Sequence, residues 1–439
     1  MTKRLYYDQP DLLEFDSVVE EAADVAGNAD GKPGERPSES SGGPARSAVI
    51  LRESAFYPTS GGQVHDTGWI MLGSGERLRV AEVADAEDGR VVHYIEAPAE
   101  MRPDWMGEGA RHIGTAIHGS IDPERRRDHM QQHTGQHVLS AAFIELYQFP
   151  TVSFHMGEDY CSIDLATEAL SAVQVAGAEK RANEIVFENR PVRIRYVRRE
   201  EAEKLGLRKL PPAERDELRL IEIADFDLSA CGGTHVAATG QIGSILLRKT
   251  EKTRQGMRVE FVCGARAVRM ARRDYATLTE AAALYSAQMS DVPAMIRKSF
   301  DESKTLRRQR EDALEQLAQA MAEAALASAD GRKEASDAAP QVILRTFSDH
   351  DTNFAKLFAQ KITRAGVPVI ALVASTINPA GMVFAQSTGG RADMGALLKQ
   401  VLSSVGGRGG GSKDFAQGGV PANCNVEQLL RQAASTIGS

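Results

Sequence analysis

The sequence predicts an α+β multidomain protein: a small antiparallel β-barrel, an α+β domain, a helical hairpin or coiled coil, and a C-terminal α/β domain. Three observations support this prediction. The 439 residues suffice for roughly three domains. Short strand-like runs punctuated by Gly and Asp fill about the first 120 residues, and strand and helix patterns follow together after them. A long helical stretch then precedes a last segment in which strands and helices alternate.

The β-barrel is expected in residues 1–115. Its strands are predicted from four short runs, at residues 47–53, 69–72, 77–83 and 90–96. Residues 24–47 are rich in Gly, Ser, Pro and charge, which predicts a long loop between two strands.

The α+β domain is expected in residues 116–268. Asp122 is a good helix N-cap and is followed by proline at the first helical position. Leu139, Ala142, Phe143 and Leu146 repeat on one face, so the helix should run to about residue 146. Another helix is expected at residues 167–189, and strands at 161–165, 192–197, 218–223, 242–248 and 257–263.

The sequence of residues 269–335 is typical of helices, and Pro293 is expected to divide the stretch into two helices. Leu306, Ala313, Leu317 and Ala320 are spaced by seven, four and three residues, as in a coiled coil. A helical hairpin and a dimerising coiled coil both fit this pattern. A homodimer could therefore form through this region or through the C-terminal domain.

The C-terminal α/β domain is expected in residues 336–439, after a linker at 331–340. Its expected strands are 342–347, 368–374 and 382–387, and its helices are 351–365, 393–405 and one at the C-terminus. Residues 406–419 contain many glycines and are predicted to be a loop. Asp349-His-Asp351 has the composition of a metal motif, but Asp351 is better explained as the N-cap of the following helix.

Composition narrows the possible classes of protein. The net charge is 52 − 60 = −8, which argues mildly against a nucleic-acid binder. Residues 248–273, however, hold nine Lys or Arg against two acids, a distribution that suits a bound polyanion. The longest apolar run, residues 367–374, is far short of the about 20 residues of a membrane span. Four cysteines and no apolar N-terminal stretch predict a reduced, cytoplasmic protein without a membrane segment.

Two short spacings point to a metal site. His133 and His137 are four residues apart in a predicted helix, so both imidazoles should project from one face. Cys231 and His235 flank two glycines that allow a tight turn. Three imidazoles and a thiolate are a natural tetrahedral set for Zn²⁺. Surface or core histidines would explain the first pair alone, whereas both pairs together favour a metal. His129 lies one helical turn before His133, but a fifth ligand is unnecessary, so we expect it next to the site or on the surface rather than among the ligands.

The same residues resemble a known family. RRRDHMQQHTGQHVLSAAF (residues 125–143) and CGGTHV (231–236) resemble the editing domain of alanyl-tRNA synthetase and of its free-standing relatives, the AlaX proteins. FYPTSGGQVHDTGWI (56–70) is similar to the glycine-rich segment of the preceding barrel, and GMRVEFVCG (256–264) to the closing strand. Residues 406–419 resemble the glycine-rich loop of the DHH-associated C-terminal domain. With no room for an aminoacylation module before the barrel, the chain resembles the long-form AlaX proteins.

The resemblance implies one Zn²⁺ per chain, bound by His133, His137, Cys231 and His235. It also implies a deacylase that hydrolyses the aminoacyl ester of mischarged tRNA-Ala, chiefly Ser-tRNA-Ala and also Gly-tRNA-Ala. Zinc with four protein ligands would shape the pocket around a positioned water, and zinc that released one ligand could activate that water. Two alternatives stay open: a non-catalytic tRNA-binding module with a structural zinc, and a zinc hydrolase of a small ester.

A polar contact should read the serine hydroxyl, because an apolar pocket separates serine from alanine by only about 1–3 kcal/mol. The candidates for this catalytic pocket are Thr59 and Gln63 of the glycine-rich segment and Ser153, in the strand after the first helix. A plain turn would also explain the first two, and a polar strand edge would explain the third.

Overall fold

The computed structural model describes residues 1–25, 46–96, 113–205, 207, 216–330, 340–421 and 424–437. It forms two compact units, Met1–Glu280 and Ala281–Ser439, which are considered one at a time. The expected loop at 24–47 and the expected linker at 331–340 lie mostly outside the described residues. Within the described ranges, no helix is long and apolar enough to cross a membrane.

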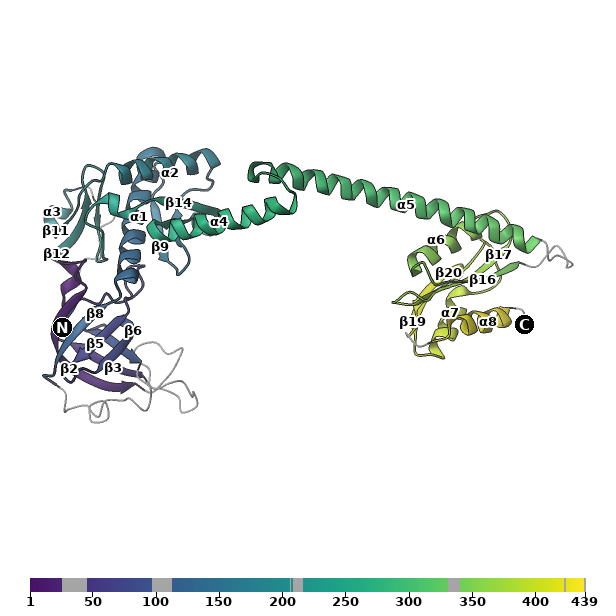
Figure 1. The fold of residues 1–439 in the computed structure, drawn as a ribbon, viewed down its shortest axis with the longest axis horizontal. Coiled ribbons are helices and arrows are strands. Elements are labelled where there is room, and N and C mark those ends of the chain that lie inside the picture. The colour runs from purple at the N-terminus through teal and green to yellow at the C-terminus, as the bar shows by residue number, and fades with distance from the viewer. Residues whose placement is uncertain are drawn as a thin grey trace. The chain divides into compact units, whose positions relative to one another are not determined.

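The first unit begins with the predicted barrel, drawn in purple and blue in Figure 1. Six antiparallel strands close it in the order β2-β3-β7-β6-β5-β8. Their bounds are β2 (Glu14–Val25), β3 (Arg46–Leu51), β5 (Gly68–Leu72), β6 (Arg77–Asp85), β7 (Val91–Glu96) and β8 (Ala116–Ile121). Strands β3, β5, β6 and β7 are the four predicted runs. Strands β2 and β8 were not predicted, and β8 carries the barrel beyond residue 115.

The predicted α+β domain follows. The helix α1 (Pro123–Tyr147) packs against α2 (Ala172–Phe187) and the sheet β14-β15-β10-β9, around an apolar core. The strands of this sheet are β9 (Thr151–Met156), β10 (Cys161–Leu165), β14 (Ile245–Thr253) and β15 (Gly256–Cys263). A second sheet has the order β11-β12-β13, with β11 (Val192–Arg198), β12 (Glu217–Ile223) and β13 (Asp227–Ala230), and α3 (Arg199–Ala202) follows β11. Near the N-terminus, the short β1 (Lys3–Arg4) pairs with β4 (Glu53–Ser54).

The helix α1 begins as its sequence predicts. The Asp122 carboxylate accepts hydrogen bonds from the backbone N–H groups of Glu124 and Arg125, and Pro123 occupies the first position. These contacts satisfy amides that an uncapped helix would leave without partners. One face of most helices meets water, but α1 is buried on nearly all sides from His129 to Phe143. Its polar side chains must therefore find partners inside the protein.

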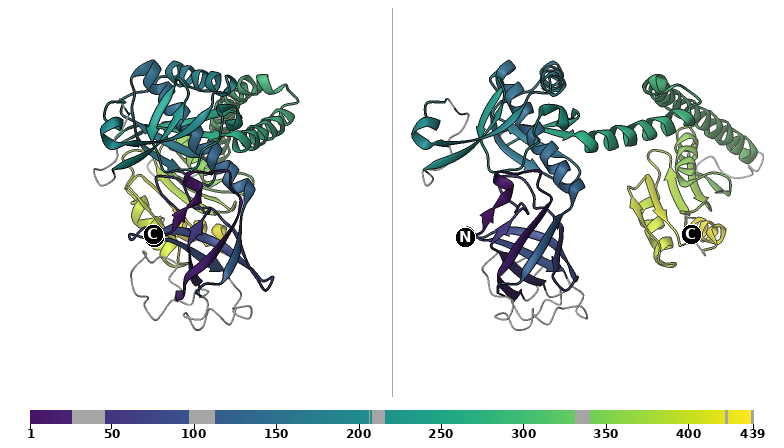
Figure 2. Two further views of the ribbon diagram at one scale, coloured as in Figure 1. Left: turned by 90° about the vertical axis from the view of Figure 1, so that its left-hand side faces the viewer. Right: turned by 60° about the vertical axis from the view of Figure 1, so that its left-hand side comes forward.

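In the second unit, a five-stranded sheet lies between two helical layers, as the views in Figure 1 and Figure 2 show. Its order is β16-β17-β18-β20-β19. Alternate residues of β17 face the two layers: Ala371 packs with α5 and α6, and Leu372 packs with α7 and α8. The bounds are β16 (Gln341–Phe347), β17 (Val369–Ser375), β18 (Gly381–Gln386), β19 (Arg408–Gly411), β20 (Phe415–Gly419), α5 (Val292–Asp330), α6 (Thr352–Thr363), α7 (Met394–Ser403) and α8 (Val426–Ile437). The Asp351 carboxylate caps α6, as expected.

The helices α4 (Gly264–Leu284) and α5 are separate, as Pro293 predicts. The face of α5 that packs differs from the expected heptad, however. Leu306 and Leu317 are exposed, whereas Ala318 and Ala322 are buried against α6 and the sheet. Alanine suits these two buried positions because its small side chain lets α6 pack close to α5.

Residues 406–419 form a β-hairpin rather than the predicted loop. Strand β20 pairs with both β18 and β19, so its backbone amides are committed to the sheet. Glycine is required by packing here: a β-carbon at Gly409 or Gly418 would lie 2.7 Å or 2.3 Å from the Leu402 side chain of α7. The glycines therefore let the hairpin fit beneath a helix.

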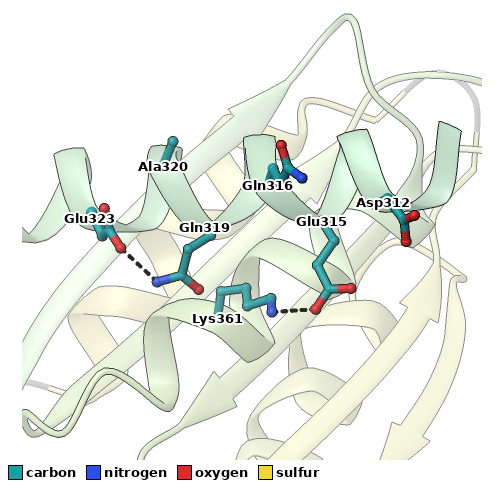
Figure 3. A pocket seen from close by; sticks show the side chains of 7 residues that line it. All are labelled: Asp312, Glu315, Gln316, Gln319, Ala320, Glu323 and Lys361. Atoms are coloured by element: carbon teal, nitrogen blue, oxygen red, sulfur yellow. Dashed lines mark hydrogen bonds and ion pairs between the residues drawn. The ribbon is translucent and has the colours of Figure 1, made fainter. Parts of the chain in front are cut away.

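Figure 3 shows a hollow between α5 and α6. Its polar contacts are an ion pair of 2.5 Å between Lys361 and Glu315, and a hydrogen bond from Gln319 to Glu323. Both are contacts of a solvated surface, where an ion pair contributes little to stability.

A buried histidine should make the barrel sensitive to acid. His93 is fully buried, and burial lowers its pKa to about 4, although its hydrogen bond to the Val49 carbonyl opposes the shift. The unfolded chain binds this proton near pH 6.5, so folding stability falls as the pH drops from 6.5 towards 4. Between pH 7 and pH 5 the loss should be about 2 kcal/mol. The variant His93→Gln should lack this part of the pH dependence.

Urea unfolding at pH 7 and pH 5 measures the difference. Both tryptophans, Trp69 and Trp105, fall in the first 115 residues, so fluorescence follows this part of the chain. Equal pH dependence in wild type and His93→Gln would contradict the prediction.

Candidate metal centre

The four predicted ligands come together. His133 and His137 lie one turn apart on α1, and Cys231 and His235 occupy the turn after β13. One nitrogen of each imidazole and the Cys231 Sγ all lie within 4.8 Å of one another. Among the described residues, no other group of three or more His, Cys, Asp or Glu side chains is close enough to hold a metal.

The glycines of the CGGTH turn explain its shape. A β-carbon at Gly233 would lie 2.2 Å from the His133 ring. Only glycine lets the turn approach α1 so closely, and this approach brings Cys231 Sγ to 3.4 Å from His133 Nε2 and 3.3 Å from His235 Nε2.

Two ligand imidazoles are oriented by residues of the same domain. Asp227 Oδ2 lies 3.1 Å from His137 Nδ1. Thr134 Oγ1 donates to the Met130 carbonyl and lies 3.2 Å from His235 Nδ1. Because the threonine has only one hydroxyl hydrogen, His235 Nδ1 must be the donor in this pair. Hydrogen bonds at Nδ1 leave Nε2 free to bind a metal.

The charges of the cluster suit a cation. Burial raises the pKa of the Cys231 thiol, but the nearby His133 and His235 outweigh burial and hold that pKa well below its usual value. Burial also lowers the pKa of His235 to about 3, although the charge of the Cys231 thiolate opposes this shift. Burial opposes protonation of His137, but its bonds to Asp227 and Cys231 raise its pKa to about 9. A bound cation would compete with that proton. A thiolate and three imidazoles are a donor set that fits Zn²⁺.

A cavity of about 540 Å³ opens beside the cluster. It is bounded by the ligand side of α1, the edge strand β9 and the end of β13. His133, His137 and Cys231 line it, so a molecule in the cavity would meet the metal site directly. Its polar lining includes Gln136 and Ser153.

The three expected pocket residues lie in different places. Ser153 lines the cavity, and its hydroxyl donates to Asp164 over 2.7 Å. Thr59 is outside the lining, because it bridges to β6 and its hydroxyl contacts His65 Nδ1. Gln63 is fully buried and also outside the lining, and its amide is bonded to His133 and Thr234. Of the three, Ser153 lines the cavity, while the roles of Thr59 and Gln63 stay predictions from the sequence; Gly61, between these two, lines the cavity.

Sequence reasoning missed Gln136, which immediately precedes His137. Its side chain is 8% exposed, and Nε2 donates to Ser140 Oγ over 2.8 Å. Among the described residues, no hydrogen-bond donor is paired with Oε1 at the other end of the amide. A polar residue beside a ligand on a buried helix was the signal that could have identified it. His129 is buried in the protein core rather than on the surface, and burial, together with the nearby Arg125 and Arg266, lowers its pKa to about 2.

Three family models match the chain. Residues 218–259 match the second additional domain of threonyl and alanyl tRNA synthetases, which here includes Cys231 and His235. Residues 6–125 match the class II (A) tRNA synthetases, and residues 340–439 match the DHHA1 domain.

Curated relatives match over longer stretches. An alanine–tRNA ligase of Natronomonas pharaonis is 30% identical over 100% of this chain and 44% of the ligase. One of Pyrococcus furiosus is 32% identical over 72% of this chain and 32% of the ligase. The chain thus spans less than half the length of these ligases. The alanyl-tRNA editing protein AlaX-L of Pyrococcus horikoshii is 29% identical over 96% of this chain and 95% of that protein. The resemblance is thereby confirmed: the chain is similar over nearly its whole length to a long-form alanyl-tRNA editing protein, and it carries the synthetase second additional domain and a DHHA1 domain.

Proposed function

We propose that the chain is a trans-editing deacylase that hydrolyses the ester between a wrongly attached amino acid and tRNA-Ala. The observation that carries the proposal is the cluster of three imidazoles and a thiolate on the wall of a cavity of about 540 Å³. The similarity to AlaX-L over 96% of the chain supports the reaction class. Serine is the chief amino acid proposed, with glycine as a second, because both are small enough to share a pocket with alanine.

The metal proposed is one Zn²⁺ per chain, with His133, His137, Cys231 and His235 as ligands. Zinc bound by four protein side chains would shape the cavity and orient substrate, with a water placed against the ester carbonyl. The aminoacyl ester is already reactive, so positioning this water supplies much of the required rate. The residues that line the cavity would hold the amino acid of the substrate beside the four metal ligands.

Removing a ligand should remove the metal. Purified wild-type protein should contain one zinc per chain, and Cys231→Ala should lose most of it, because a neutral methyl group replaces the thiolate. Elemental analysis measures this directly. Wild-type protein without zinc, or Cys231→Ala with full zinc, would contradict the assignment.

The tRNA is proposed to meet exposed basic residues near the cavity domain. Arg248, Arg258 and Arg266 of the basic run are already paired with Asp274, Asp164 and Asp128. Arg269, Arg272 and Arg273 on α4 are exposed and favour phosphate contacts. We also propose a homodimer that forms through α4, α5 or the C-terminal domain. The exposed apolar side chains of Phe300 and Leu306 on α5 support it. A cytoplasmic location is proposed as well.

Specificity requires a polar reader of the serine hydroxyl. An apolar pocket separates serine from alanine by about 1–3 kcal/mol, whereas a site built to hydrogen-bond the hydroxyl can reach roughly 10⁴-fold, since alanine leaves buried groups unpaired. Of the residues proposed from sequence, Ser153 lines the cavity. Gln136 joins it as a candidate, because Ser140 anchors one end of its amide and the other end is left for a ligand.

The variant Gln136→Met keeps the size of the side chain and removes its polar end. Release of serine from Ser-tRNA-Ala should fall by roughly 10-fold or more, as expected when a buried hydroxyl loses its partner. Release of glycine should change little, because glycine has no hydroxyl, and this substrate is the matched control. Equal losses with both substrates would show that Gln136 does not read the hydroxyl, and Ser153→Ala would then be tested alone.

The function itself is tested with three charged forms of tRNA-Ala. The full chain should release serine and glycine within minutes and leave Ala-tRNA-Ala largely intact. Hydrolysis of the alanyl and seryl forms at equal rates would refute trans-editing. Binding of tRNA-Ala without any hydrolysis would identify a non-catalytic binding module, and hydrolysis of small esters alone would identify a different hydrolase.

A further inference from the structure

One side chain of the barrel reaches the candidate metal centre. Gln63 lies in a tight turn in which the backbone groups of Ser60 and Gln63 exchange two hydrogen bonds of 3.0 Å. Gly61 and Gly62 occupy the middle of the turn with φ of 56° and 85°, a conformation that suits glycine. The turn rests on β9, since a β-carbon at Gly62 would lie 2.9 Å from Phe154. The backbone thus holds the Gln63 side chain in one direction, into the α+β domain.

Every polar atom of the Gln63 amide has a partner there. The Thr234 backbone N–H donates to Gln63 Oε1 over 3.1 Å, and Gln63 Nε2 donates to Thr234 Oγ1 over 2.8 Å. These two contacts fix which end of the amide is oxygen. His133 Nδ1 lies 2.7 Å from the same Oε1. Because an amide oxygen only accepts, His133 Nδ1 must carry the hydrogen, and its Nε2 is left with a lone pair that faces Cys231 Sγ at 3.4 Å.

We propose that Gln63 is a positioning residue that selects the metal-binding tautomer of His133, and that the barrel thereby completes the metal site. The identity of the metal rests on the proposed function, whereas the geometry does not. Asp227 and Thr134 orient the other two imidazoles and belong to the same domain as the ligands. Gln63 is separated from His133 by 70 residues and comes from the barrel. Metal affinity should therefore depend on a loop that contributes no ligand.

The test compares two variants of Gln63 in the full chain. Gln63→Leu cannot accept a hydrogen bond, and Gln63→Glu keeps an acceptor for both His133 and Thr234. Loss of such an outer partner typically weakens metal binding by 10–100-fold. Zinc affinity, measured by competition with a chromophoric chelator, should fall by roughly 10–100-fold in Gln63→Leu and by much less in Gln63→Glu. Ser60→Ala, in the same turn, is the matched control and should bind zinc as the wild type does.

A second measurement does not depend on how well the variants fold. In the zinc-loaded wild type, ¹⁵N–¹H NMR should show the His133 hydrogen on Nδ1. A hydrogen on Nε2, or zinc affinity of Gln63→Leu within twofold of wild type, would overturn the positioning role. Wild-type protein that binds no zinc would instead contradict the proposed function. Wild-type protein that binds zinc but leaves Ser-tRNA-Ala intact would contradict the activity and leave the role of Gln63 standing.

Discussion

A buried ion pair between Arg126 and Asp66 sets the register on which the site depends. Arg126 is 1% exposed and Asp66 is fully buried. The guanidinium also donates to the carbonyls of Pro10 and Ala55, and the carboxylate also accepts from the Tyr57 backbone N–H. The pair therefore fastens the first turns of α1 to several segments of the barrel. Removing one partner of such a pair leaves an uncompensated buried charge and typically costs about 3–5 kcal/mol.

Because α1 is one continuous helix, the ion pair also fixes the positions of the residues that follow Arg126. His133 and His137 follow Arg126 by two and three turns on a helix that is buried on nearly all sides. Because the helix cannot rotate without unburying its core face, its imidazoles meet the CGGTH turn at one fixed place. The glycine-rich turn of the barrel is positioned by the same junction, since Asp66 lies three residues beyond Gln63. The candidate centre is therefore a product of two domains, although all four ligands come from one of them.

The sequence predicts the local parts of this account and misses the long-range ones. The spacing of His133 and His137 and the CGGTH turn are local patterns, and the structure brings them together. The partners Gln63 and Asp227 are separated from their histidines by 70 and 90 residues, so no periodicity relates them. The same limit explains the C-terminal glycines. Their composition predicts a loop, but packing beneath Leu402 makes them strands. In α5, the residues buried against α6 and the sheet are Ala318 and Ala322, which the predicted heptad does not include, whereas Leu306 is exposed.

The most direct test of the central claim is single-turnover hydrolysis of Ser-tRNA-Ala by one preparation in three states. The states are the zinc-loaded protein, the protein stripped by a chelator, and the stripped protein reloaded with one equivalent of zinc. A metal-supported editing cavity predicts rapid release of serine by the loaded protein, loss of release on stripping and recovery on reloading. Serine released at the same rate in all three states would contradict the claim that the cluster of three imidazoles and a thiolate supports the reaction.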